Sequence, residues 1–215
     1  MKYTMEHNYA LSIIIPVSGD PIESILATFS EVLTVEGQGD GFYSEVEVLI
    51  VDSFERESMY ASSCNTGTEV RFVGVTSAAA SNRGMKLQTG IDASSGAVIL
   101  LHHPRSLIDP AGLVWLYKKA ATVDNNNINS WWGGFTHKFD RVHWLLRFTS
   151  WYSNRIRPML SRILYLDHCI FFTHNALTRK IPPVSVFEDT ELSKILRESC
   201  RDPPVIAPYL SVTSA

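Results

Sequence analysis

The 215-residue sequence has only three cysteines, Cys64, Cys169 and Cys200, and no two of them form a Cys-x-x-Cys pair. Such an odd and widely spaced set argues against a disulfide framework and a zinc site, and favours buried thiols in a reducing compartment. No apolar run approaches the roughly 20 residues that a membrane-spanning helix needs. The run from Leu11 to Val17 is too short for a signal peptide and lacks a small-residue cleavage site. We therefore expect a cytoplasmic protein.

The chain also lacks a large excess of charge of either sign. Its 19 basic and 22 acidic residues give a formal net charge of −3. This charge provides no general attraction to nucleic acid, so an anionic partner must be met by a local cluster of basic residues. The length, with 45% hydrophobic and 19% charged residues, suits one compact domain over residues 1–215.

Aliphatic blocks alternate with helical patterns in the first half of the chain. The predicted strands cover residues 11–17, 46–52, 70–75 and 97–101, and the predicted helices cover residues 22–33, with Asp20 as N-cap, and 81–94. The block 97–101 is apolar throughout, as in a strand buried on both faces of a parallel sheet. The alternation predicts an α/β fold with a mostly parallel sheet, whose ligands gather at the carboxyl ends of the strands. Residues 35–43, 53–68 and 124–129 are predicted as loops.

The second half of the chain has a different character. It predicts a helix over 110–123, strands over 131–135 and 169–172, and a helix that begins near Glu188. Residues 141–162 contain five arginines and no acid, interleaved with aromatic and aliphatic residues, and Pro158 should end or kink a helix there. Two interpretations are open. The segment is a helix packed on the sheet with solvated arginines, or a surface that lies on an anionic membrane or grips a lipid-linked substrate.

Two adjacent acids, Glu188 and Asp189, stand where an apolar run meets the start of the last predicted helix. The helix dipole favours acids in a first turn, so capping explains them without any chemistry. The functional interpretation is a general base at the edge of the sheet, because a carboxylate suits that role.

The candidate motifs fall at residues 11–17, 46–52, 81–90, 95–102 and 187–193. Their order and spacing resemble those of family 2 glycosyltransferases with the GT-A fold, and most of all the small subgroup labelled "transferase 2, radical-SAM/selenodomain-associated". The resemblance implies a Rossmann-like nucleotide-diphospho-sugar transferase fold, with a nucleotide-binding half at about 11–105 and an acceptor-side half at about 106–213. It also implies transfer of a sugar from a UDP- or GDP-sugar to an acceptor.

The resemblance implies donor-side roles for residues in the first half. Pro16 and Val17 would lie at the nucleotide pocket, with Asp20 in place of the family's usual acid. Asp52 would accept hydrogen bonds from the base or ribose. Arg83 would face the nucleotide phosphates as a charge-assisted donor.

On the acceptor side, the resemblance assigns Asp189, with Glu188 beside it, to the acidic pair of the family. The aspartate of that pair takes a proton from the acceptor hydroxyl during inverting transfer. Asp167 and His168 fall where relatives carry an Asp-Gln pair near the acceptor.

The sequence departs from the family where a divalent cation is expected. Members carry an Asp-x-Asp-like motif, or His-Ala-Asp in the subgroup, whose last acid helps to hold Mg²⁺ or Mn²⁺. Here His102 and His103 are followed by Pro104, which has no ligand to offer. Imidazole suits Mn²⁺ better than Mg²⁺, and without a metal Arg83, Arg105 or another cation would have to offset the diphosphate charge.

These departures leave a second function open beside the transferase. It is a catalytically impaired relative that binds a nucleotide or a partner. A hydrolytic metal site on His102 and His103 is disfavoured, because adjacent residues of a strand point to opposite faces.

Overall fold

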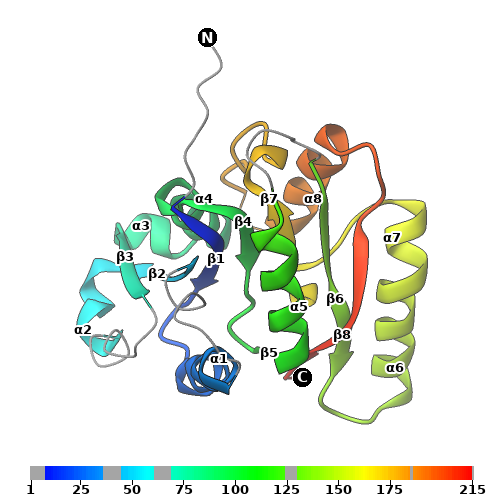
Figure 1. Cartoon of the computed structure of the whole chain (residues 1–215), viewed down its shortest axis with the longest axis horizontal. Helices are drawn as coiled ribbons and strands as arrows, with labels where there is room; N and C mark the ends of the chain where they lie inside the picture. The colour runs from blue at the N-terminus through cyan, green and yellow to red at the C-terminus, as the bar shows by residue number, and fades with distance from the viewer. Residues whose placement is uncertain (1–7, 36–44, 61–68, 124–129, 185, 215) are drawn as a thin grey trace.

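The computed structural model describes residues 8–35, 45–60, 69–123, 130–184 and 186–214. Its strands form one sheet of eight, in the order β3-β2-β1-β4-β7-β6-β8-β5 (Figure 1). The strands are β1 (Tyr9–Pro16), β2 (Val46–Ser53), β3 (Glu69–Val75), β4 (Gly96–Leu101), β5 (Ser106–Ile108), β6 (Trp132–Phe139), β7 (Phe171–Thr173) and β8 (Val205–Thr213).

The four strands of the first half are parallel and confirm the predicted ones. β1 lies between β2 and β4, and β3 lies outside β2. Every residue of β2 and β4 is buried, because helices cover both faces of the sheet. This burial explains why the two strands are mostly apolar, and the buried Glu47 of β2 accepts a hydrogen bond from the Ser12 hydroxyl at 2.6 Å.

Helices α1 (Glu23–Val35) and α5 (Pro110–Ala121) cover one face of the sheet, and α3 (Ser77–Ala80), α4 (Arg83–Ala93) and α8 (Glu188–Ser199) cover the other. The alternation along β1 shows the two layers. Ile13 and Ile15 belong to the apolar cluster that includes α1 and α5, whereas Ile14 belongs to the cluster of α4 and α8.

Helix α4 is placed by a cap and by a close approach to the sheet. The Asn82 side chain accepts a hydrogen bond from the Met85 N–H at 3.0 Å, which satisfies a free donor of the first turn. At Gly90 a Cβ would lie 2.5 Å from Cγ2 of Ile14, so only glycine allows the helix this close to β1. Because α4 follows the parallel strand β3, its N-terminus lies at the carboxyl edge of the sheet.

The second half of the sheet is mixed. β7 is antiparallel to both β4 and β6, β8 is parallel to β6, and β5 is antiparallel to β8. The strand predicted over 169–172 was wrong at its start, because residues Leu166–His168 form a 3₁₀ turn and Cys169 has a φ of 47°. The sequence analysis did not predict β5 or β8.

Several boundaries differ from the prediction. Helix α1 begins at Glu23, so Asp20 does not cap it and instead accepts a hydrogen bond from the Ser18 N–H at 3.0 Å. Within the loop predicted over 53–68, residues Phe54–Arg56 form a 3₁₀ turn and Glu57–Tyr60 form α2. The loops predicted over 35–43 and 124–129 lie almost wholly outside the described residues, as does Cys64. Cys169 and Cys200 are buried and free.

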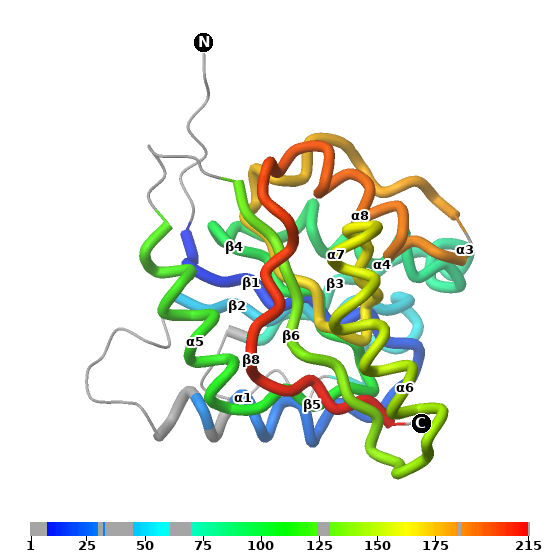
Figure 2. Tube along the Cα trace, turned by 90° about the vertical axis from the view of Figure 1, so that its right-hand side faces the viewer, coloured from blue at the N-terminus to red at the C-terminus, as the bar shows by residue number. Residues whose placement is uncertain are grey.

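A long helical segment follows β6 and packs along it (Figure 2). It consists of α6 (Trp144–Trp151), a π-helical turn (Tyr152–Ile156) and α7 (Arg157–Leu160), and we call these residues the outer helix. Pro158 does not end it at once, because proline in the first turn of α7 needs no N–H partner. In the part of the chain that the structure describes, no helix is long and apolar enough to cross a membrane.

Candidate functional site

Two clefts lie where β1, β2 and β4 end and where α4 and α8 begin. The first, which we call the basic cleft, has a volume of about 410 Å³. It is lined by Pro16, Ser18, Asp20, Ser81, Arg83, Lys86, His103, Pro104 and Arg105. The second, which we call the acidic cleft, has a volume of about 300 Å³. It is lined by Arg83, Tyr165, Leu166, Asp167, Val186, Phe187 and Asp189.

Three basic side chains and one carboxylate line the basic cleft. Arg83 and Lys86 come from the first turn of α4, and Arg105 follows Pro104. The carboxylate is Asp20, whose Oδ1 lies 3.8 Å from the Arg105 Nε. The positive excess suits an anion with several oxygens, and a helix N-terminus adds to it.

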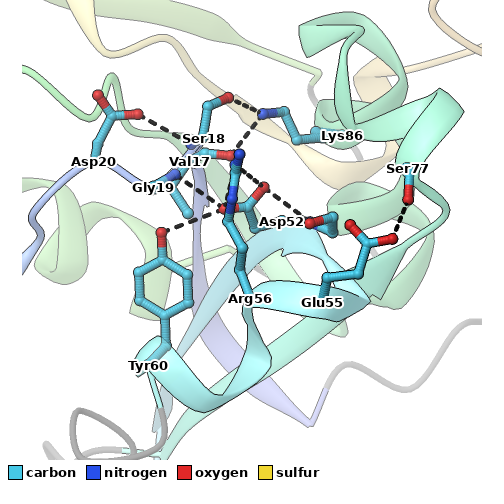
Figure 3. Close-up of polar contacts among 11 residues, drawn as sticks. Val17, Ser18, Gly19, Asp20, Asp52, Glu55, Arg56, Tyr60, Ser77 and Lys86 are labelled. Atoms are coloured by element: carbon cyan, nitrogen blue, oxygen red, sulfur yellow. Dashed lines mark hydrogen bonds and ion pairs between the residues drawn. The ribbon is translucent and has the colours of Figure 1, made fainter.

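Lys86 is the functional candidate that the sequence analysis missed. Its side chain is 2% exposed, and its Nζ donates hydrogen bonds to the Val17 carbonyl at 2.6 Å and to the Ser18 Oγ (Figure 3). Burial lowers the pKa of its ammonium group. A signal was present in the sequence, because Lys86 stands three residues after Arg83, on the same face of the helix.

Asp52 is buried beneath the loop that ends β1, and it does not line either cleft. Its carboxylate accepts hydrogen bonds from the Gly19 N–H at 3.1 Å, from the Arg56 Nη1 at 3.3 Å and from the Tyr60 hydroxyl at 3.3 Å (Figure 3). Burial and the Asp52 charge raise the pKa of Tyr60 to about 12. Asp52 therefore positions the loop in this structure, and its predicted contact with the base or ribose stays a prediction.

Asp189 lies in the first turn of α8 and faces the acidic cleft. Its carboxylate accepts hydrogen bonds from the Leu166 N–H at 3.3 Å and from the Thr190 N–H at 2.7 Å. Burial, and then the charge of Glu188, raise the pKa of Asp189. Phe187, directly before the helix, is held at a φ of 64°, which is rare for a residue with a Cβ. A buried carboxylate with a raised pKa is a stronger proton acceptor than an exposed one.

Two pairs of side chains join the clefts. Arg83 lines both clefts, and its Nε pairs with the buried Glu188 carboxylate. His103 lines the basic cleft, and its Nε2 lies 3.8 Å from Oδ1 of Asp167 in the acidic cleft. The two clefts therefore adjoin at Arg83.

His102 and His168 lie in the core. His102 is 1% exposed and stands edge-on to the Phe29 ring, and burial lowers its pKa to about 3. His168 bonds the Ser153 Oγ and the Phe135 carbonyl, each at 2.9 Å, and burial lowers its pKa to about 4. Neither imidazole lines a cleft. His168 instead ties the outer helix to β6.

The residues at this edge do not fit a divalent cation. Among the described residues, no group of three or more His, Cys, Asp or Glu could hold a metal ion. His102 faces the core, away from the cleft lined by His103. The one carboxylate in the basic cleft, Asp20, already accepts the Ser18 N–H and lies beside Arg105. Mg²⁺ and Mn²⁺ prefer several carboxylate oxygens, and Asp20 is the one carboxylate among the residues that line the basic cleft.

No family model and no curated protein matches the sequence. Solved structures do match the fold. TarS from S. aureus aligns with a TM-score of 0.67 and 15% identity over 95% of this chain and 36% of its own. Residues 1–349 of TarS in complex with UDP-GlcNAc align with a TM-score of 0.66 and 15% identity, over 95% of this chain and 58% of that one.

The mannosyltransferase PcManGT from Pyrobaculum calidifontis, in complex with GDP-Man and Mn²⁺, aligns with a TM-score of 0.61 and 14% identity. The alignment covers 94% of this chain and 56% of that one. This chain thus spans less than two thirds of the length of each of these three structures. At such identities the likeness concerns the fold, and the chain has the α/β fold of GT-A glycosyltransferases.

Proposed function

We propose that the protein transfers a sugar from a nucleoside-diphosphate sugar to an acceptor hydroxyl, with inversion at the anomeric carbon. The donor, a UDP- or GDP-sugar, binds with its diphosphate in the basic cleft, and the acceptor occupies the acidic cleft. Membership of the radical-SAM-associated subgroup of family 2 glycosyltransferases, which the sequence resembles, is part of this proposal.

One observation carries the proposal. A cleft with a positive excess and a cleft with a buried carboxylate meet at Arg83, at the sheet edge where α/β proteins bind ligands. An inverting transferase needs two adjoining clefts of this kind, because the acceptor oxygen must attack the anomeric carbon on the side opposite to the departing diphosphate. GDP-Man and UDP-GlcNAc in structures of the same fold support the choice of donor class.

Each residue then has a chemical task. The Asp189 carboxylate takes the proton from the acceptor hydroxyl while that oxygen forms its bond to the anomeric carbon. The bond between the anomeric carbon and the diphosphate oxygen breaks, and its electron pair stays on the diphosphate. Arg83, Lys86 and Arg105 offset the charge that develops there. Glu188 holds Arg83 and keeps the pKa of Asp189 high.

The remaining cleft residues position the two substrates. Asp20 fixes the loop after β1 through the Ser18 N–H, and Pro16 forms part of the wall of the basic cleft. Asp167 accepts a hydrogen bond from the acceptor in this proposal, because it lines the acidic cleft and has His103 beside it. Val17 acts through its carbonyl, which holds the Lys86 ammonium.

The experiment measures release of nucleoside diphosphate from UDP- and GDP-sugars, with Mn²⁺, with Mg²⁺ and with chelator. For a donor that turns over, Asp189→Asn should lower the rate roughly 100-fold or more, because a general base contributes at least that much. The dissociation constant for the free nucleotide should stay near the wild-type value. Asp92→Asn, at the other end of α4, is the matched control. Undiminished turnover in Asp189→Asn would remove this residue from the mechanism.

The runner-up function is a nucleotide-binding or partner-binding protein without transfer activity. Pro104 favours it, because this residue leaves the expected cation without a ligand. Tight nucleotide binding without release of product from any donor, in the same assay, would select it over the transferase.

A further inference from the structure

The outer helix turns polar side chains toward the sheet and apolar side chains toward solvent. Small and polar side chains face the sheet: Ser150 and Ser153 are buried, and the Asn154 side chain bonds both the N–H and the carbonyl of His137 at 2.8 Å. The large apolar side chains face outward. A helix that serves only to cover a sheet turns its apolar face inward, so packing on β6 does not explain this one.

The outward face carries a continuous group of exposed apolar residues, which with the preceding Val142 we call the apolar face. Its members are Val142, Trp144, Leu145, Phe148, Trp151, Tyr152, Met159 and Leu160. Trp144 is 73% exposed and Leu160 is 81% exposed. In Figure 1 the segment forms one flank of the molecule, with β6 and β8 on its inner side. Apolar groups gathered in this way mark an interaction surface.

The charges around the apolar face indicate what covers it. Residues 141–162 contain five arginines and no acid. Arg141, Arg147 and Arg155 are exposed beside the apolar side chains. A second copy of the chain would bring arginines against arginines across the contact. An anionic bilayer attracts them instead, and tryptophan and arginine are the residues that a membrane interface accommodates.

We propose that the outer helix docks the protein on an anionic lipid bilayer, lying in the interface with its apolar face inserted. The helix also adjoins the acidic cleft. The Arg157 guanidinium stacks on the Tyr165 ring at 4.0 Å, and Tyr165 lines that cleft. If the proposed transfer holds, on which this further step rests, the acceptor is an amphiphile whose hydroxyl enters the cleft while its apolar part stays in the bilayer.

The test is sedimentation with vesicles of phosphatidylcholine, with and without phosphatidylglycerol, at low and high salt. We expect binding to the anionic vesicles alone, weakened by salt. The triple variant Arg141→Gln, Arg147→Gln, Arg155→Gln should bind roughly 100-fold more weakly, since each arginine near an anionic surface contributes about fivefold. The matched control removes three exposed basic residues elsewhere, Arg179→Gln, Lys180→Gln and Arg201→Gln.

A second pair of measurements isolates the apolar face. The double variant Trp144→Ser, Phe148→Ser changes exposed residues, so it should fold normally and lose most vesicle binding. Lipids brominated in the acyl chain should quench the fluorescence of Trp144 and Trp151. The proposal is overturned if the wild type does not sediment with anionic vesicles at low salt, or if the arginine variant and its control sediment equally. It is also overturned if the wild type is a dimer and the Trp144→Ser, Phe148→Ser variant is a monomer. Asp189→Asn should bind vesicles as the wild type does, so docking is judged separately from catalysis.

Discussion

Lys86 provides the sharpest test of how the basic cleft binds its ligand. Its ammonium group has three donors, and two of them go to neutral acceptors, the Val17 carbonyl and the Ser18 hydroxyl. Neither partner cancels the positive charge. The charges of the Asp52 and Asp20 carboxylates act on this ammonium group. The side chain nevertheless lines the cleft together with Arg83 and Arg105, so an anion bound there is attracted to it.

The size of the effect follows from that geometry. A hydrogen bond to a charged group contributes about 1.5–3 kcal/mol, which corresponds to roughly 10- to 150-fold in the dissociation constant. Coulomb's law at a separation of 4 Å and an effective dielectric constant of 20 sets an upper bound of about 4 kcal/mol. We therefore expect Lys86→Met to weaken the binding of UDP or GDP by roughly 10- to 150-fold.

The assay is calorimetric titration of each nucleotide into wild type and variant in the presence of chelator. Lys180→Met, which removes an exposed lysine paired with Asp92, is the control and should leave binding unchanged. Thermal unfolding of each variant checks that the fold persists, because Lys86→Met also removes a partner from the Val17 carbonyl. A folded Lys86→Met protein with wild-type affinity would refute the assignment. A large gain in wild-type affinity on adding Mn²⁺ would refute the conclusion that the cleft does not fit a metal.

Two further predictions concern pH. The folded-state pKa of His102, about 3, lies below the ordinary value of 6.5. The unfolded chain therefore binds the proton more tightly, and stability falls as the pH drops below about 6.5, by about 2 kcal/mol at pH 5. The free energy of unfolding, measured with urea, should therefore fall less on acidification in His102→Leu than in the wild type, by that same amount. Equal losses in the two proteins would contradict a buried neutral His102. Because the charge of Glu188 helps to raise the pKa of Asp189, Glu188→Gln should move the acidic limb of the pH–rate profile to lower pH; an unchanged limb would contradict this coupling.

The sequence analysis predicted the first half of the fold well, for a local reason. Strands β1, β2 and β4 are buried over most of their length, so each one contains a run of at least three consecutive apolar residues. The second half was predicted less well. β5 has three residues, and β8 contains Pro208 and pairs with β6 across a register shift. Such strands exist because distant segments pair with them, and no short window of sequence carries that information.

The candidate site divides in the same way. Sequence order placed Arg83 at the start of the helix that follows the parallel strand β3, and parallel strands bring such helix starts to one edge of the sheet. Glu188 and Asp189 were placed by the start of a helix alone, because the strand before α8 is the antiparallel β7. The sequence did not indicate the direction in which each side chain points. His102 and His168 carry groups suited to chemistry, yet both rings lie in the core. For Lys86 the sequence offers only its spacing of three residues from Arg83, and this spacing does not reveal that its ammonium lies buried against the loop after β1.

The sequence by itself therefore determined the strands and main helices of the first half, the α/β class and the identity of the carboxylates, since apolar periodicity and residue chemistry are local properties. Only the tertiary structure decided that Asp52 holds a loop and that three basic groups share one cleft. It also decided that the outer helix turns its tryptophans outward. The physical reason is that burial and the distances between charges depend on which distant residues pack together. The same type of side chain therefore has a different pKa and a different role in the core and at the surface.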